Sequence, residues 1–292
     1  MTNSDLLVSI GMPVFNGARY IRPALDSLLA QSYENFELNI SDNASTDGTE
    51  EICRSYLAKD NRVRYHRNPR NFGLMENWHR VLQLASGEYF MWAACDDCWS
   101  DNYIGTLLEC LAGCPHAILA AGKTLYIEDS GDSRNVDPPD DAPARYSADN
   151  LSRAKQLLQQ HAHGWLHGLF RRHSLLRLAP TFFAADPWGA DMVFLLMLCL
   201  RNEVVGTDAA IMYKRATGSS GPKTPRQRVR WQCWYARALF QVIRNSSLSA
   251  EEKRELFKTY VLYLKWLYFR RGIIAWAKLW GRAGFHWLRG VD

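Results

Sequence analysis

Short apolar runs and helical repeats alternate along the first third of the chain. Leu6–Met12 and Phe36–Ile40 are apolar runs of strand length, and we expect the first strand to end at Pro13. Between these runs, apolar residues recur at helical spacing over residues 21–29 and form one apolar face. The alternation is typical of an α/β protein in which helices cover a sheet.

The same alternation continues to residue 94. Turn-forming residues over Asp42–Gly48 precede a helix that we expect to begin near Thr49. Val63–His66 and Tyr89–Ala94 are expected strands, and the apolar spacing over Leu74–Ala85 predicts a helix between them. Strands that alternate with helices favour a mostly parallel sheet with flanking helices, which binds ligands at the carboxyl ends of its strands.

The pattern changes after residue 127. Glu128–Arg145 contains three prolines and six acidic residues, so we expect a surface loop. A helix over Asn150–His161, a strand over Gly168–Arg171 and a strongly apolar helix over Asp191–Asn202 are expected next. Beyond Pro225 the pattern is helical throughout.

Charge and aromatic content divide the chain in the same way. Residues 215–292 hold 16 Lys/Arg against 4 Asp/Glu, a net charge of +12, and six of the eleven tryptophans. The whole chain carries +5, which leaves −7 for residues 1–214. We therefore expect a main domain over residues 1–220, with halves at 1–127 and 146–220, and an all-helical, aromatic and basic extension over residues 221–292.

The basic extension suits contact with an anionic partner. Aromatic, Lys and Arg side chains mix over Thr259–Trp287, as in helices that lie on an anionic membrane surface. The longest apolar run, Tyr260–Phe269, contains Lys265 and is too short to span a bilayer. Alternatively, these aromatics pack on the main domain or in a homo-oligomer. Nucleic acid is disfavoured, because the first part of the chain is acidic and no recognition motif is present.

The cysteines and histidines suggest two metal sites that we do not favour. The seven cysteines lack the spacing of a disulfide framework, and residues 1–10 lack the features of an export signal, so we expect a cytoplasmic protein with reduced thiols. Zinc spacing is present in Cys95-x-x-Cys98 with Cys110-x-x-x-Cys114, but the first pair brackets two aspartates. His161, His163 and His167 are better explained as pocket or solvated residues.

Polar or turn-forming residues follow all four expected strands. They are Pro13-Val14-Phe15-Asn16, Asp42-Asn43, Asn71-Phe72-Gly73 and Cys95-Asp96-Asp97. Because these clusters lie at carboxyl ends of strands, we expect them to converge on one edge of the sheet. Asp96 and Asp97 are hard oxygen ligands, and Mg²⁺ or Mn²⁺ is commonly held by one or two carboxylates together with phosphates and waters.

In order and spacing, these motifs resemble those of the family 2 glycosyltransferases of the GT-A fold, over roughly residues 6–215. The resemblance implies an inverting enzyme with a nucleotide-sugar-binding half at 1–127, an acceptor-side half at 146–220 and a divalent metal, Mg²⁺ or Mn²⁺. Carried over by position, it implies that Asp42 accepts the ring N–H of a uracil or thymine. The other implied donor-side residues are Pro13, Phe15, Asn16, Asn71, Gly73 and Asp96, and the implied metal ligands are Asp96 and Asp97.

The sequence departs from the family pattern at two positions. Aligned on Trp99, the usual Asp-x-Asp becomes Ala94-Cys95-Asp96, so the first aspartate is missing and the second is kept. Many relatives have a histidine at the position of Ala216. Lys214 or Arg215 can supply positive charge to the diphosphate there instead.

Asp191 is the candidate catalytic base, because Gly189-Ala190-Asp191 precedes an apolar helix where the family places its acidic base. The alternative is a helix N-cap. His167, Gly168 and Trp188 are expected on the acceptor side. The predicted function is transfer of a sugar from a UDP- or dTDP-linked donor to a hydroxyl of a growing or lipid-linked surface glycan. The alternative is a non-catalytic nucleotide-sugar-binding or scaffold protein with this fold; a nucleotidyltransferase is disfavoured, because residues 1–20 lack a Gly-rich basic loop.

Overall fold

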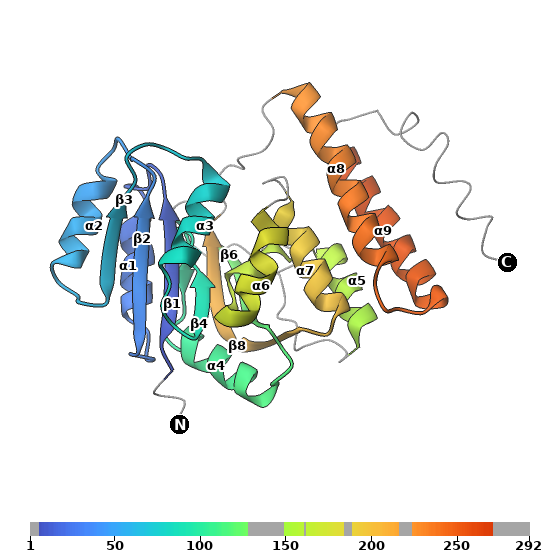
Figure 1. Cartoon of the computed structure of the whole chain (residues 1–292), viewed down its shortest axis with the longest axis horizontal. Helices are drawn as coiled ribbons and strands as arrows, with labels where there is room; N and C mark the ends of the chain where they lie inside the picture. The colour runs from blue at the N-terminus through green and yellow to red at the C-terminus, as the bar shows by residue number, and fades with distance from the viewer. Residues whose placement is uncertain (1–5, 128–148, 161, 184–188, 216–223, 271–292) are drawn as a thin grey trace.

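The structure, a computed structural model, describes residues 6–127, 149–160, 162–183, 189–215 and 224–270 (Figure 1). In this part of the chain, eight strands form one sheet in the order β3-β2-β1-β4-β7-β6-β8-β5. The strands are β1 (Val8–Val14), β2 (Phe36–Asp42), β3 (Val63–Arg67), β4 (Tyr89–Trp92), β5 (Cys98–Trp99), β6 (Leu119–Ile127), β7 (Leu169–Arg171) and β8 (Val204–Arg215).

The sheet is mixed, and its N-terminal part is parallel. Strands β3, β2, β1 and β4 run parallel to one another, whereas β7 is antiparallel to both β4 and β6. Strand β8 is parallel to β6 and antiparallel to β5. The predicted parallel strands are confirmed, while β6 and β8 were not predicted.

Helices cover the sheet on both sides (Figure 1). One apolar cluster lies between the sheet and α1, α2 and α4. The second lies between the other face of the sheet and α3, α5, α6 and α7, and it extends to α8 and α9, which pack on α7 and α5. Because side chains alternate along a strand, Phe90 and Trp92 of β4 join the second cluster, whereas Tyr89 and Met91 join the first. The helices are α1 (Ile21–Leu29), α2 (Thr49–Leu57), α3 (Leu74–Leu84), α4 (Tyr103–Gly113), α5 (Asn150–Gln160), the 3₁₀ helix η3 (His163–His167), α6 (Arg172–Phe183), α7 (Ala190–Leu200), α8 (Pro225–Arg244) and α9 (Ala250–Arg270).

The prediction that the first strand ends at Pro13 was wrong, because β1 continues through Pro13 to Val14, paired with β2. The carbonyl of Gly11 accepts the N–H of Ala93, so the backbone groups of Gly11 and of Pro13, two residues later, face the β4 side. Pairing with β4 ends at Gly11. A residue at position 13 would donate no hydrogen bond to a neighbouring strand, so the missing N–H of Pro13 costs the sheet no hydrogen bond.

The described C-terminal helices share a core with the acceptor-side half. Trp231, Tyr235 and Leu239 of α8 and Tyr260 of α9 are buried in the cluster that contains α5 and α7. A Cβ added to Gly189, which has φ +91° ahead of α7, would lie 2.6 Å from the Tyr235 ring. These buried aromatics therefore have a packing role. None of the described helices is long and apolar enough to cross a membrane.

A buried carboxylate joins β1, β2 and the start of β4. Glu37 accepts hydrogen bonds from the hydroxyls of Ser9, at 2.6 Å, and Ser86, at 2.8 Å, and pairs with Arg64 at 2.8 Å. Burial alone raises the pKa of the Glu37 carboxyl, but the hydrogen bonds and the charge of Arg64 outweigh it, so the pKa lies below its usual value. Glu37 is therefore held in its ionised form.

Candidate functional site

The loops after β1 and β2 are connected by hydrogen bonds. The Asn16 N–H donates to Ser45 Oγ at 2.8 Å, and Asn16 Oδ1 accepts the N–H of Thr46 at 2.8 Å. Asn16 adopts φ +53°, a left-handed conformation that asparagine tolerates better than most residues. Phe15, the residue before it, is exposed. The loop after Pro13 is thereby fixed against the second strand end, with one aromatic ring open to solvent.

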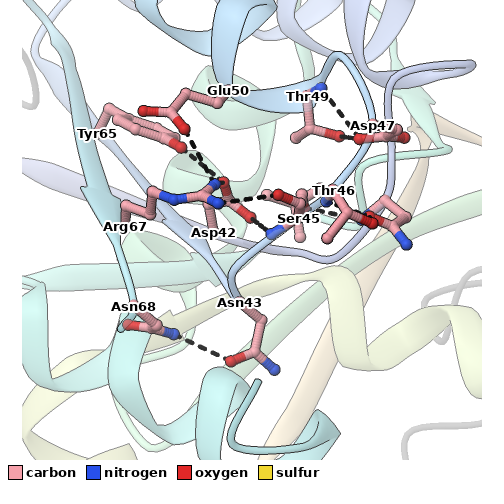
Figure 2. Close-up of polar contacts among 12 residues, drawn as sticks. Asp42, Asn43, Ser45, Thr46, Asp47, Thr49, Glu50, Tyr65, Arg67 and Asn68 are labelled. Atoms are coloured by element: carbon pink, nitrogen blue, oxygen red, sulfur yellow. Dashed lines mark hydrogen bonds and ion pairs between the residues drawn. The ribbon is translucent and has the colours of Figure 1, made fainter. Parts of the chain in front are cut away.

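Asp42 lies at the end of β2, and its side chain is 0% exposed. Its Oδ2 accepts from the Tyr65 hydroxyl at 2.6 Å and from Arg67 Nη1 at 2.7 Å, while Oδ1 accepts the Ser45 N–H at 2.8 Å (Figure 2). Arg67 also pairs with Glu50 at 3.1 Å. Because the Asp42 side chain is 0% exposed, a nucleobase can reach it only after this cluster rearranges. The contact stays a prediction.

An amide network holds the third strand end against the second. Asn43 Nδ2 donates to Asn71 Oδ1 at 2.7 Å and to the Gly73 carbonyl at 3.1 Å. Asn43 Oδ1 accepts from Asn68 Nδ2 at 3.1 Å (Figure 2). Gly73 has φ +92°, which favours glycine over any residue with a side chain. Asn71 shapes the edge of the site through its hydrogen bond to Asn43, and Gly73 does so through its backbone conformation.

The fourth strand end brings Asp96 and Asp97 next to the end of β8. Asp97 is buried, and its Oδ1 accepts the backbone N–H of Arg215 at 2.8 Å. Arg215 Nε donates to the Asp96 carbonyl at 3.1 Å. Burial and the adjacent charge of Asp96 raise the pKa of Asp97 to about 7. Two carboxylates are thus held together, and Asp97 is the more enclosed.

Asp96 and Asp97 suit a divalent cation whose remaining coordination positions are filled by a diphosphate. Paired carboxylates whose ionisation is opposed by burial and mutual repulsion are stabilised by a cation. Among the described residues, no group of three or more His, Cys, Asp or Glu side chains could hold a metal on its own. Mg²⁺ commonly takes one or two carboxylates with substrate phosphates, so two protein ligands are compatible with it.

The zinc alternative has no support in the described residues. Their Cys, His, Asp and Glu side chains form no group of three or more that could hold a metal ion, whereas a structural zinc site takes four such ligands.

Asp191 occupies the first turn of α7 and contacts His163 of η3. His163 Nδ1 lies 2.6 Å from Asp191 Oδ2, and the two side chains are 37% and 27% exposed. Burial alone raises the pKa of the Asp191 carboxyl, but His163, the Met192 N–H and Lys214 outweigh it and lower the pKa below its usual value. The structure therefore holds an ionised carboxylate that solvent can reach. The N-cap of α7 is Gly189, so Asp191 lies within the first turn of the helix and not at the cap position.

His167 and Gly168 pack against the sheet between η3 and β7. His167 is buried, and its Nδ1–H donates to the Trp92 carbonyl at 3.1 Å. Burial and nearby Lys214 lower the pKa of His167 to about 4, so the ring is neutral at pH 7. A Cβ added to Gly168 would lie 2.2 Å from the Ala120 carbonyl oxygen, so only glycine fits there. Trp188 and Ala216 lie outside the described residues.

Lys214 connects the two sides of the site. Its charge lowers the pKa values of Asp97, of Asp191 and of His167, so all three lie within electrostatic reach of one ammonium group. The charge of Lys214 therefore acts both on a strand-end carboxylate and on Asp191.

Sequence reasoning missed the roles of Tyr65, Arg67 and His163. Strand β3 pairs with β2 so that Arg67 lies opposite Asp42, a register that would have indicated the ion pair. His163 was recognised as part of a histidine cluster but not as the partner of Asp191. No sequence signal joins these residues, since η3 and α7 meet only in the folded chain.

Two solved glycosyltransferase structures share the fold of this chain. Staphylococcus aureus TarS residues 1–349 in complex with UDP-GlcNAc aligns with a TM-score of 0.70 at 17% identity, covering 94% of this chain and 78% of that one. The mannosyltransferase PcManGT of Pyrobaculum calidifontis, in complex with GDP-Man and Mn²⁺, aligns with a TM-score of 0.54 at 18% identity, covering 93% and 77%. At these identities the similarity shows the fold, a mixed GT-A sheet with flanking helices.

The chain belongs to glycosyl transferase family 2, whose family model matches residues 9–177. Glycosyltransferase GlyG of Streptococcus pneumoniae is 32% identical over 103 residues, which are 35% of this chain and 34% of GlyG. TuaG of Bacillus subtilis, a glycosyltransferase named for teichuronic acid biosynthesis, is 32% identical over 129 residues, 44% of this chain and 51% of TuaG. The matched region thus spans about a third to a half of these relatives.

Proposed function

We propose that the chain is an inverting glycosyltransferase that moves a sugar from a UDP- or dTDP-linked donor to a hydroxyl of a growing or lipid-linked surface glycan. The observation that carries the proposal is that the Arg215 N–H holds Asp97 at the end of β8, next to Lys214, whose charge also lowers the pKa of Asp191. The site thus offers Asp191 as a carboxylate base. Within reach of the Lys214 ammonium it also offers the Asp96–Asp97 pair, which suits a divalent metal bound to a diphosphate.

In the proposed reaction, Asp191 accepts the proton of the acceptor hydroxyl. The acceptor oxygen forms a bond to the anomeric carbon as the bond from that carbon to the diphosphate breaks, and the nucleoside diphosphate leaves with the electron pair. A single displacement of this kind inverts the anomeric configuration. Lys214 stabilises the negative charge that collects on the diphosphate.

Asp96 is the residue we propose as the direct ligand of Mg²⁺ or Mn²⁺, with Asp97 held beside it by the Arg215 N–H. A bound divalent ion would act as a Lewis acid toward the leaving diphosphate. The complexes of TarS with UDP-GlcNAc and of PcManGT with GDP-Man and Mn²⁺ support a metal-assisted nucleotide-sugar donor.

The acceptor proposal is supported by TuaG, named for teichuronic acid biosynthesis, and by the basic C-terminal region. Within that region, α8 carries the exposed Arg226 and Arg230 near its start. Peripheral contact with an anionic membrane through these helices would bring the site close to a lipid-linked acceptor. The buried aromatics of α8 and α9 take no part in such contact.

The test is release of nucleoside diphosphate from a panel of nucleotide sugars, with and without Mn²⁺ and with lipid-linked acceptors. Asp191→Asn is expected to lower kcat by about 10²–10⁴-fold, because base assistance is lost, while donor binding is kept. The exposed Asp101→Asn is the matched control and is expected to leave kcat unchanged. Biological activity that survives both Asp191→Asn and Asp96→Ala in a folded protein would favour the non-catalytic alternative.

A further inference from the structure

We propose that His163 is a positioning residue for Asp191, which orients its carboxylate and keeps it ionised for proton transfer. The inference rests on the proposed function, because Asp191 is the base in that reaction. His163 acts through Asp191 and is not itself assigned a contact with the acceptor.

The geometry of the pair is direct. A distance of 2.6 Å between His163 Nδ1 and Asp191 Oδ2 is that of a strong, charge-assisted hydrogen bond. A carboxylate can only accept, so Nδ1 carries the proton and donates it. The bond fixes one carboxylate oxygen and with it the direction of the group.

The segment that carries His163 is anchored to the sheet. The neighbouring Ala162 and Trp165 are both fully buried. A Cβ added to Gly164 would lie 2.1 Å from Thr124 Oγ1 in β6, so the η3 backbone lies directly against that strand. The imidazole thus projects from a rigid support, and its 37% exposure is compatible with the mouth of a site.

In the described part of the chain, the groups that interact with the Asp191 carboxylate come from η3, α7 and β8. They are His163 and His167 from η3, the Met192 N–H of α7 and Lys214 from β8. His167 is buried and has a lowered pKa, so it is neutral at pH 7 and contributes no cation. His163 lowers the pKa of Asp191 through both a charge interaction and a hydrogen bond, and its effect is larger than that of Lys214.

Two substitutions separate the hydrogen bond from the charge. His163→Asn keeps an N–H donor near the position of Nδ1 but cannot be protonated, whereas His163→Ala removes both functions. The matched control is His173→Asn, at an exposed position on α6.

The first measurement is kcat/KM from pH 5 to 8.5. In the wild type, Asp191 is ionised throughout this range and sets no acid limb. Removal of His163 takes away interactions that lower the Asp191 pKa, so we expect this pKa to rise and both variants to gain an acid limb in which the rate falls about tenfold per pH unit. At pH 8 we expect His163→Asn to stay within about threefold of the wild type, His163→Ala to lose about tenfold, and donor KM to change in neither.

The second measurement needs no substrate and distinguishes failure of this inference from failure of the proposed function. The ¹³Cγ signal of Asp191, assigned by its loss in Asp191→Asn, is followed between pH 4 and 8. An upward shift of its titration in His163→Asn, absent in His173→Asn, supports the pairing whether or not any sugar is transferred. Unchanged Asp191 titration in folded His163→Asn and His163→Ala would overturn the inference.

Discussion

Leu239→Ala tests whether the C-terminal helices and the acceptor-side half unfold as one unit. Leu239 of α8 is 0% exposed and lies in the cluster shared with α5, α7 and α9. Truncation of a fully buried leucine removes its transfer free energy and leaves a cavity, which costs about 2–5 kcal/mol. Taking about 3 kcal/mol, and about 2–4 °C per kcal/mol for a chain of this size, we expect Tm to fall by about 6–12 °C.

The assay is thermal unfolding followed by calorimetry and by circular dichroism. Leu262→Ala on α9 is the matched control, because that side chain is 64% exposed and its truncation is expected to change the free energy of unfolding by less than about 0.5 kcal/mol. We expect a single transition that moves as a whole in Leu239→Ala. Two separated transitions, of which only the smaller moves, would refute the shared core and support the predicted separate extension over residues 221–292.

Two further predictions concern the sheet. Gly168→Ala is expected to destabilise the fold by about 1–3 kcal/mol, because its Cβ would lie 2.2 Å from the Ala120 carbonyl oxygen. Gly105→Ala in α4 is expected to stabilise the fold by about 0.5–1 kcal/mol, because no atom lies within 4 Å of its Cβ. Urea unfolding measures both changes. Glu37 has a folded pKa below its unfolded value of 4.5, so its contribution is present above pH 4.5 and is lost as pH falls through the folded pKa. Glu37→Gln should flatten the loss of stability below pH 4.5 in urea unfolding at several pH values, and an unchanged slope would exclude Glu37 as its source.

The parallel part of the sheet was predictable from sequence because each of its elements has a local signal. The apolar run of β2, the helical spacing of α1 and the turn residues before α2 all indicate their own structure. The place of β4 beside β1, and not beside β3, has no such local signal. Strands β6 and β8 have weaker local signals, since their side chains are small or alternate irregularly in burial. Their pairing depends on contacts between residues far apart in sequence.

The sequence alone determined which chemical groups the site contains: carboxylates and amides after four strands and an aspartate at the start of α7. Residue type and order along the chain carry that information. Only the tertiary structure decided their partners: Arg67 and Tyr65 on Asp42, the Arg215 N–H on Asp97, and His163 on Asp191. Partners and burial govern the ionisation of a carboxylate, and both arise only when distant segments pack together.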